Sequence, residues 1–347
     1  MKSQHRWLER GQGEPVVLLH GLMGQMHHWD DVLDELGGAC RAMAPTLPIF
    51  DPGCLEPSID LLARWVVDFL DALEIPRAVI GGNSLGGHVA LATALAFPER
   101  VRAVILTGSS GLFERSFTRG VPHRPTADYL REKMEEVFFD RTLVTPEWVE
   151  SVRCTLIERA SVRRVLGFAR AAKRDNLEAR LVDLAAPTLI VWGAEDRITP
   201  LDVGRRFHAL IPGSRLVILA GCGHAPILEH PRAFAGIVRR WLAAERLQGG
   251  ATVGAGVPRW SRELAAFCST GSPIVAGAHS KPWRDGPWRR RGRRCWTWCA
   301  ALRERGSDGV TISQESARSR TTRPVSASAS ISTFARCGPV SSRASAT

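Results

Sequence analysis

A single serine flanked by glycines constrains this chain more than any other feature. Residues 82–86 read Gly-Asn-Ser-Leu-Gly, and they lie between the apolar run Ala78–Ile80 and a helix-like stretch, Gly87–Phe97. A serine at a sharp strand-to-helix turn presents its hydroxyl outward, beside the amide groups that open the helix. Glycines two residues to either side leave room for the turn. The sequence therefore predicts a reactive hydroxyl at Ser84.

Three further polar segments follow the ends of predicted strands. These are His20-Gly21 after Val16–Leu19, Gly193-Ala194-Glu195-Asp196 after Thr188–Trp192, and Gly221-Cys222-Gly223-His224 after Leu216–Leu219. The carboxyl ends of parallel strands lie along one edge of a sheet, so these side chains are expected to meet there. The order serine, acid, histidine is also that of a strand-end nucleophile and its partners.

These motifs resemble those of the α/β-hydrolase-fold serine hydrolases over about residues 5–246. The residues that carry the resemblance are His20-Gly21, Gly82–Gly87, Pro98–Val101, Asp196 and Gly223-His224. Other stretches resemble the bacterial carbon–carbon bond hydrolases that cleave meta-ring-fission products, namely Gly82-Asn83-Ser84, Trp192-Gly193 and Glu229-His230. The resemblance implies an α/β fold with a mostly parallel central sheet and helices on both faces.

The same resemblance implies a catalytic triad. Ser84 would be the nucleophile, His224 would take and return its proton, and Asp196 would orient the imidazole. An acyl-enzyme would form on the serine and be hydrolysed by water. Glu195 is an alternative acid, with Asp196 then a turn or N-cap residue.

The oxyanion would be held by backbone amides. We expect those of Leu22, directly after His20-Gly21, and of Leu85, directly after the nucleophile. His20, Gly21 and Asn83 are expected to support the site. Neither a metal nor a cofactor is expected.

Domain organisation follows from where the strand pattern stops. Apolar strands alternate with amphipathic helices up to about residue 110 and again from 184 to 250, which is typical of a parallel sheet covered on both faces. We therefore predict a core of residues 1–110 and 184–250. Residues 111–183 contain only helical patterns and are predicted as a helical lid, inserted after the strand ending near Thr107.

Within the predicted lid we expect helices over Ala127–Phe139, over Pro146–Ile157 with Thr145 as N-cap, and from Val162 to Arg170 or beyond. Six aromatic residues are candidates to line the pocket, and the alternative is that they hold the lid helices together. They are Phe113, Phe117, Phe138, Phe139, Trp148 and Phe168.

The charge is concentrated in the last segment of the chain. Residues 1–250 contain 30 Lys+Arg and 30 Asp+Glu, so the formal net charge of +11 belongs to residues 251–347. That basic, low-complexity segment lacks periodicity and is predicted to be a disordered tail. The balanced charge of the body gives no indication of a specific nucleic-acid partner. No apolar run is long enough for a membrane span or a secretory signal, which predicts a cytoplasmic protein.

Three functions are consistent with these motifs. The main prediction is hydrolysis of a small, largely apolar ester or lactone. The first alternative is a carbon–carbon bond hydrolase of the meta-cleavage-product type, which Asn83 favours. Two departures count against it: Ala225-Pro226 follow His224 where those enzymes usually carry tryptophan, and Thr46–Phe50 differs from their usual Asp-Leu-Pro-Gly-x-Gly. The second alternative is a noncatalytic ligand-binding relative. The oligomeric state stays open.

Overall fold

The computed structural model of the chain describes residues 5–51, 56–113 and 126–249. All of these residues belong to one compact unit of the chain. The tail predicted over residues 251–347 lies outside the described residues, as does Phe117.

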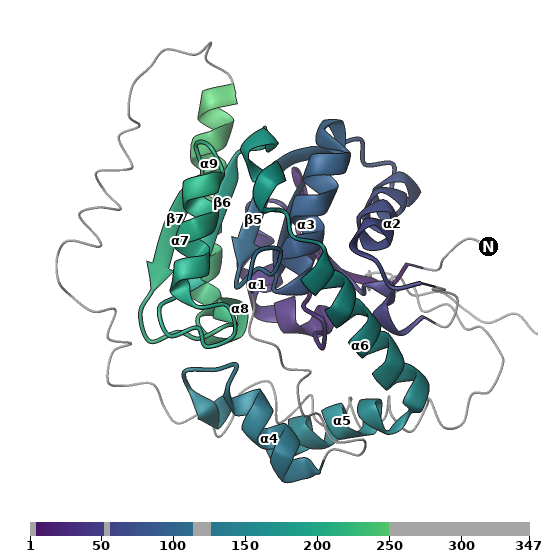
Figure 1. Cartoon of the computed structure of the whole chain (residues 1–347). Helices are drawn as coiled ribbons and strands as arrows, with labels where there is room; N and C mark the ends of the chain where they lie inside the picture. Colours follow the sequence, from purple (N-terminus) through teal and green to yellow (C-terminus); the bar gives the residue numbers. More distant parts are fainter. Residues whose placement is uncertain (1–4, 52–55, 114–125, 250–347) are drawn as a thin grey trace, which may run out of the picture. The chain divides into compact units, whose positions relative to one another are not determined.

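A seven-stranded sheet forms the centre of the described part (Figure 1). Its strands lie in the order β1-β3-β2-β4-β5-β6-β7. The strands are β1 (Trp7–Arg10), β2 (Pro15–Leu19), β3 (Arg41–Pro45), β4 (Ala78–Asn83), β5 (Val101–Thr107), β6 (Thr188–Gly193) and β7 (Arg215–Leu219). The edge strand β1 pairs antiparallel with β3, and the other pairs along the sheet are parallel. The predicted fold class is confirmed.

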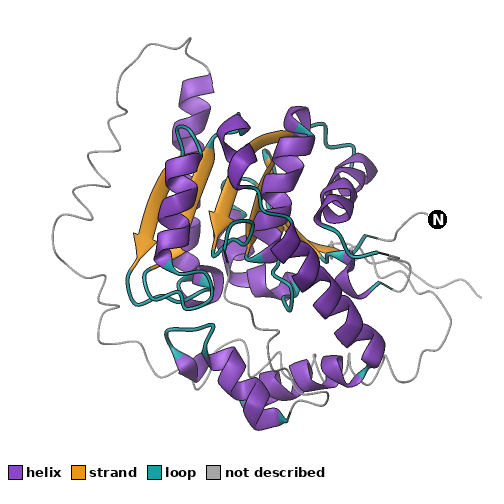
Figure 2. Ribbon diagram, in the orientation of Figure 1, coloured by secondary structure: helices purple, strands orange, loops and turns teal. Residues whose placement is uncertain are grey.

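Helices cover both faces of this sheet (Figure 2). One face packs against α1 (Asp30–Leu36) and α9 (Pro231–Gly249), and the other packs against α2 (Ile59–Ala72), α3 (Leu85–Ala96) and α7 (Leu201–Leu210). Successive side chains of a strand point to opposite faces, so both faces of a covered strand must be apolar. In β2, Val16 and Leu18 pack on the first face, whereas Val17 and Leu19 pack on the second.

Two helices begin directly after a residue whose side chain caps them, and for Thr145 the cap was predicted. The Ser58 Oγ accepts a hydrogen bond from the Leu61 amide at 3.1 Å, which caps α2. The Thr145 Oγ1 accepts one from the Trp148 amide at 3.2 Å and caps α5 (Pro146–Ile157). Each cap satisfies an amide that has no partner within the first turn of its helix.

The described residues between β5 and β6 contain three α-helices: α4 (Ala127–Glu135), α5 and α6 (Arg159–Arg174). We refer to these described residues, 126–177, as the insertion. The prediction of one helix over Ala127–Phe139 was wrong at its end, because α4 stops at Glu135. Beyond it, the Val137 carbonyl and the Phe139 amide bond to residues near His224 rather than within a helix.

Candidate active site

Ser84 lies at the turn between β4 and α3, with backbone angles φ 56° and ψ −119°. Among the described residues other than glycine, it shares a positive φ with Glu74. Such a conformation is strained for a residue with a Cβ atom. It directs the side chain away from the helix that follows. A Cβ on Gly82 would lie 2.2 Å from the carbonyl carbon of Gly86. The glycines therefore permit the tight turn.

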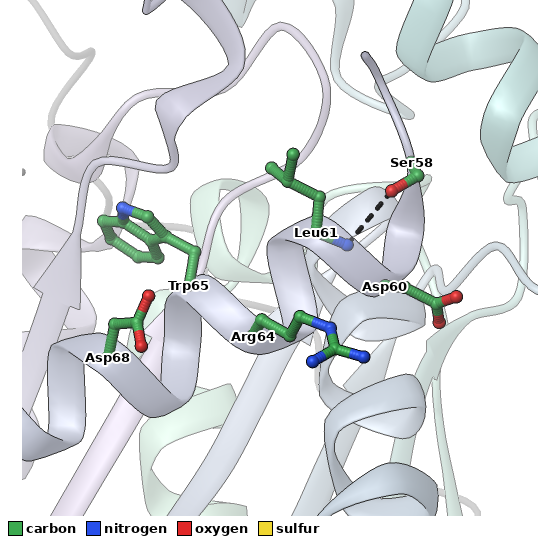
Figure 3. Close-up of a pocket in the computed structure, with 6 residues that line it drawn as sticks. All are labelled: Ser58, Asp60, Leu61, Arg64, Trp65 and Asp68. Atoms are coloured by element: carbon green, nitrogen blue, oxygen red, sulfur yellow. Dashed lines mark hydrogen bonds between the residues drawn. The ribbon is translucent and has the colours of Figure 1, made fainter. Parts of the chain in front are cut away.

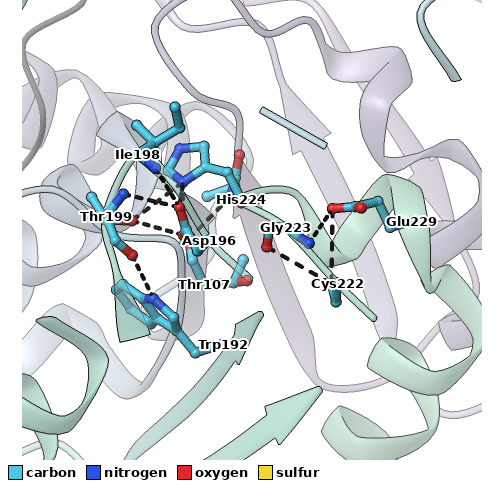
Figure 4. A network of polar contacts seen from close by, with 10 residues as sticks. Thr107, Trp192, Asp196, Ile198, Thr199, Cys222, Gly223, His224 and Glu229 are labelled. Atoms are coloured by element: carbon cyan, nitrogen blue, oxygen red, sulfur yellow. Dashed lines mark hydrogen bonds and ion pairs between the residues drawn. The ribbon is translucent and has the colours of Figure 1, made fainter. Parts of the chain in front are cut away.

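His224 and Asp196 lie against each other at the ends of β7 and β6 (Figure 4). The His224 Nδ1 is 2.9 Å from the Asp196 Oδ2 and 3.2 Å from its Oδ1. Both residues are buried. An imidazole that donates its Nδ1–H to a carboxylate carries its acceptor lone pair on Nε2, which is the nitrogen that a general base needs.

The loop after β6 supplies the remaining hydrogen bonds to Asp196. Its Oδ1 accepts from the amides of Ile198 at 2.8 Å and Thr199 at 2.9 Å, and its Oδ2 accepts from the Thr199 hydroxyl at 2.9 Å. Trp192 donates its indole N–H to the Thr199 carbonyl at 2.8 Å. Sequence reasoning missed Thr199, although a threonine three residues after an acidic residue is a recognisable turn signal.

The alternative acid, Glu195, is engaged elsewhere. Its Oε2 accepts from the Cys222 amide at 2.9 Å, and its own amide donates to the Cys222 carbonyl at 3.0 Å. The carboxylate that faces the His224 ring is therefore that of Asp196, and Glu195 instead holds the backbone of the loop that carries the histidine.

Asn83 connects the histidine loop to the serine turn. Its Nδ2 donates to the His224 carbonyl at 2.9 Å and to the Thr107 carbonyl at 3.2 Å. The Ser84 amide also donates to Thr107, at 3.1 Å. A Cβ on Gly108 would lie 2.9 Å from the His224 Nδ1, so the ring rests directly on that glycine. The ends of β4 and β5 thus bring the histidine beside the residue next to Ser84.

His20 stands at the start of the predicted oxyanion loop as a neutral imidazole. Its Nδ1 is 2.8 Å from the Gly21 carbonyl, and the Leu47 amide donates to its Nε2 at 3.0 Å. The carbonyl can only accept and the amide can only donate, which fixes the proton on Nδ1. Burial lowers the pKa of His20 from 6.5 to about 4. The residue thus ties the loop to the segment after β3.

The oxyanion loop itself lies beside the serine. A Cβ on Gly21 would lie 3.3 Å from the Ser84 Cβ, so the residue before Leu22 is in close approach to the predicted nucleophile. Leu85 begins α3 directly after Ser84. Leu22 and Leu85, whose amides are predicted to bind the oxyanion, therefore each follow one of the two residues in contact, Gly21 and Ser84.

The six aromatic residues divide into groups. Phe168 is fully buried in the core on the α2 and α3 side, while the Phe138 and Trp148 rings lie 5.5 Å apart within the insertion. Phe113 and Phe139 are exposed. For Phe138, Phe168 and Trp148 these contacts fit the alternative of holding helices together better than that of lining a pocket.

A separate hollow of about 350 Å³ lies along α2 (Figure 3). Its lining residues are Ser58, Asp60, Leu61, Arg64, Trp65 and Asp68. None of the predicted catalytic residues belongs to it, and it is not part of the candidate active site.

No helix among residues 5–51, 56–113 and 126–249 is both long and apolar enough to cross a membrane.

Comparison with known proteins agrees with this geometry. The profile of the Alpha/beta hydrolase family matches residues 16–237. The chain is 33% identical over 258 residues to the 2-hydroxy-6-oxo-2,4-heptadienoate hydrolase of Pseudomonas putida, covering 68% of this chain and 91% of that protein. It is 32% identical over 258 residues to a 2-hydroxy-6-oxo-6-phenylhexa-2,4-dienoate hydrolase of Burkholderia cepacia, covering 68% of this chain and 90% of that protein.

Solved structures give the same grouping. A meta-cleavage product hydrolase from Pseudomonas fluorescens superposes with a TM-score of 0.62 at 26% identity, covering 70% of this chain and 94% of that one. A thermophilic esterase from Thermogutta terrifontis superposes with a TM-score of 0.58 at 25% identity, covering 69% and 93%. The predicted resemblance and the assignment as a hydrolase are confirmed. The chain belongs to the alpha/beta hydrolase family.

Proposed function

We propose that this hydrolase cleaves the carbon–carbon bond of a 2-hydroxy-6-oxo-2,4-dienoate, the class of compound named in its relatives from Pseudomonas putida and Burkholderia cepacia. The observation that carries the proposal is the match to the first of these over 91% of its length. The carbon–carbon bond hydrolase was our alternative prediction, and this match favours it over the ester or lactone hydrolase that was our main one.

In the proposed reaction Ser84 adds to the 6-oxo carbon while His224 takes its proton. The three hydrogen bonds from Ile198 and Thr199 hold the Asp196 carboxylate in place, so that it can orient the imidazole and offset its charge. The amides of Leu22 and Leu85 would stabilise the oxyanion. Removing one such donor typically lowers turnover by about 100- to 1000-fold.

Cleavage then differs from ester hydrolysis in its leaving group. The dienol must first become its keto tautomer, in which the 2-hydroxyl has lost its proton and C5 has gained one, because only a tetrahedral C5 lets the breaking bond overlap with the conjugated system. The electron pair of the breaking C5–C6 bond then passes through C4 and C3 to the 2-oxo group, and the resulting dienolate takes up a proton. The His224 imidazolium is the proposed proton source. Water, activated by the same histidine, hydrolyses the acyl group from Ser84, so that one water is added across the bond.

The proposed lid over residues 111–183 would cover the substrate. Support comes from the chain order, because the insertion leaves the sheet after β5 and returns before β6, beside the strands that carry Ser84 and Asp196. We propose the core as residues 1–110 and 184–250, and a cytoplasmic site of action on a small-molecule substrate.

Ester hydrolysis stays the second candidate because of the residue after His224. Ala225 is buried against Phe138, Val144 and Val149 of the insertion. Its small side chain departs from the tryptophan of the carbon–carbon bond hydrolases, and the likeness to a thermophilic esterase agrees with this reading.

The test is turnover by the full chain. A coloured 6-methyl or 6-phenyl dienoate is mixed with enzyme and its visible absorbance followed, alongside short p-nitrophenyl esters and the Ser84→Ala variant. We expect a dienoate kcat/KM at least about 100-fold above that for the esters, with Ser84→Ala losing both activities. Faster turnover of esters than of either dienoate would refute the carbon–carbon assignment. Equal activity of the variant would refute the triad.

A further inference from the structure

The loop that carries His224 is packed against the chain just after α4. The His224 amide donates to the Val137 carbonyl at 2.8 Å. A Cβ on Gly223 would lie 2.7 Å from that same carbonyl oxygen and 2.8 Å from the Phe139 amide nitrogen. The backbone of the insertion therefore contacts the residue adjacent to the proposed general base.

One carboxylate bridges these two segments. Glu229, the last residue of α8 (Pro226–Glu229), accepts from the Gly223 amide through Oε1 at 2.8 Å and from the Phe139 amide through Oε2 at 2.7 Å. Figure 4 shows it beside Gly223 and Cys222. The two oxygens thus join the histidine loop to the insertion.

The bridge depends on an ionised side chain with two acceptors. An amide in its place would present one oxygen and one NH₂, and the NH₂ would face a backbone N–H donor. Burial raises the pKa of the Glu229 carboxyl, although its amide hydrogen bonds act in the opposite direction. Burial also raises the pKa of the Cys222 thiol, whose Sγ lies 3.8 Å from the Glu229 Oε1. The thiol keeps its proton and adds no negative charge beside the bridge.

Glu195 offers a matched comparison, because its side chain binds the loop that carries His224. Its carboxylate also binds a backbone amide, that of Cys222, at 2.9 Å. It comes from the loop after β6, and its hydrogen bonds with Cys222 join two core segments rather than the core and the insertion. One glutamate therefore holds the loop to the core, and the other holds it to the insertion.

We propose that Glu229 is a positioning residue that couples the insertion to His224, so that the turn over residues 137–139 and the imidazole move as one. Contact of a substrate with the insertion then affects the placement of the base. The proposal rests on the proposed role of His224, though not on the identity of the substrate.

The experiment compares Glu229→Gln with Glu195→Gln in the full chain. The first readout is the labelling rate of Ser84 by a small fluorophosphonate, which needs the serine and histidine but not a dienoate. The second is hydrogen exchange of the amides of residues 137–140, and the third is the split between kcat and KM on whichever substrate wild type turns over.

For Glu229→Gln we expect faster exchange at residues 137–140 and labelling slowed by about 10- to 100-fold, since small displacements of a catalytic group cost rates of that order. We expect kcat to fall more than KM rises. Glu195→Gln should leave exchange at residues 137–140 as in wild type. Glu229→Asp, which keeps the charge but is too short to reach both amides, should behave like Glu229→Gln.

Several outcomes would overturn the coupling. They are wild-type labelling in Glu229→Gln, unchanged exchange at residues 137–140, or the same change of exchange in both Gln variants. If Glu229→Gln does not fold, the same measurements on Glu229→Asp decide between the outcomes, with the same criteria. A wild type that labels normally but turns over no dienoate would refute the proposed function alone, and the labelling and exchange readouts would still decide the coupling.

Discussion

Acidification is expected to destabilise this fold through His20. The imidazole is 2% exposed, and both ring nitrogens are engaged, one as donor to Gly21 and one as acceptor from the Leu47 amide. A second proton on Nε2 would point at an N–H donor. Burial therefore holds the pKa of His20 near 4 in the native state, against 6.5 in an exposed chain.

The sign of the effect follows from proton linkage. The unfolded chain binds the proton more readily than the native state at pH values between these two pKa values, so the unfolding free energy falls as pH falls. The contribution is complete above about pH 6.5 and is lost progressively towards pH 4. For a shift from 6.5 to about 4, linkage gives a loss of about 2 kcal/mol between pH 7 and pH 5.

The assay is urea unfolding of wild type and His20→Gln at pH 7 and pH 5. The substitution itself lowers stability at both pH values, because the hydrogen bonds to Gly21 and Leu47 change. The quantity of interest is the difference between the two acid-induced losses, in which that common cost cancels. Wild type should lose about 2 kcal/mol more than the variant. Equal losses would show that His20 is protonated as easily when folded as when unfolded, and the neutral assignment would be wrong.

Three further predictions concern other parts of the chain. Ser84→Gly should be more stable than Ser84→Ala by about 1 kcal/mol in thermal or urea unfolding, because glycine adopts φ 56° without strain; a less stable glycine variant would argue against strain at the turn. Thr199→Val, which removes the hydroxyl donor to Asp196, should lower kcat by roughly 10- to 100-fold with little change in KM, and a change confined to KM would contradict an orienting role. Truncation after residue 249 should leave the melting temperature and activity nearly unchanged, since the family profile ends at residue 237, and a marked drop in either would show that the removed segment contributes to the body.

The sequence was most informative where a local signal decides the structure. Helix α5 has the predicted bounds, Pro146–Ile157, and β5 ends at Thr107, where the strand before the predicted lid was expected to end. The strained turn at Ser84 was predictable because a tight strand-to-helix turn needs small residues on both sides of the serine. These features depend on residues close together in the chain, and such interactions can be deduced from order alone.

The sequence was least informative where distant backbone groups meet. Nothing local to residues 136–139 ends α4, since the Val137 carbonyl and the Phe139 amide bind groups about 90 residues later in the chain. The partner of His20 is the amide of Leu47, within the stretch that departs from the family pattern. The bridging role of Glu229 could not be predicted, because a carboxylate shared by two amides cannot be identified without coordinates.

The topology gives a reason why specificity and catalysis should be linked here. The insertion follows β5 in the chain, and the neighbours of β5 in the sheet, β4 and β6, end at Ser84 and near Asp196. Two segments of the insertion, residues 137–139 and residues 175–177, contact elements that carry proposed catalytic residues. The first of these segments, the turn after α4, bonds to the His224 loop. The second places the Asp175 Oδ2 3.0 Å from the Nε2 of His88, a buried residue of the nucleophile helix, and the Leu177 amide 2.8 Å from the Gly111 carbonyl.

Each of these two segments is thus held to an element that carries a proposed catalytic residue, one to the histidine loop and the other to α3, which begins directly after Ser84. Movement of the insertion to admit a bulkier substrate would displace both. Substitutions in residues 137–139 or 175–177 are therefore expected to change kcat together with KM, as measured on a homologous series of substrates. The Glu150–Arg153 pair, at 2.6 Å within α5, is paired inside its own helix, and its removal should change neither. If substitutions in these two segments changed KM and left kcat unchanged, the insertion would move without displacing the proposed catalytic groups.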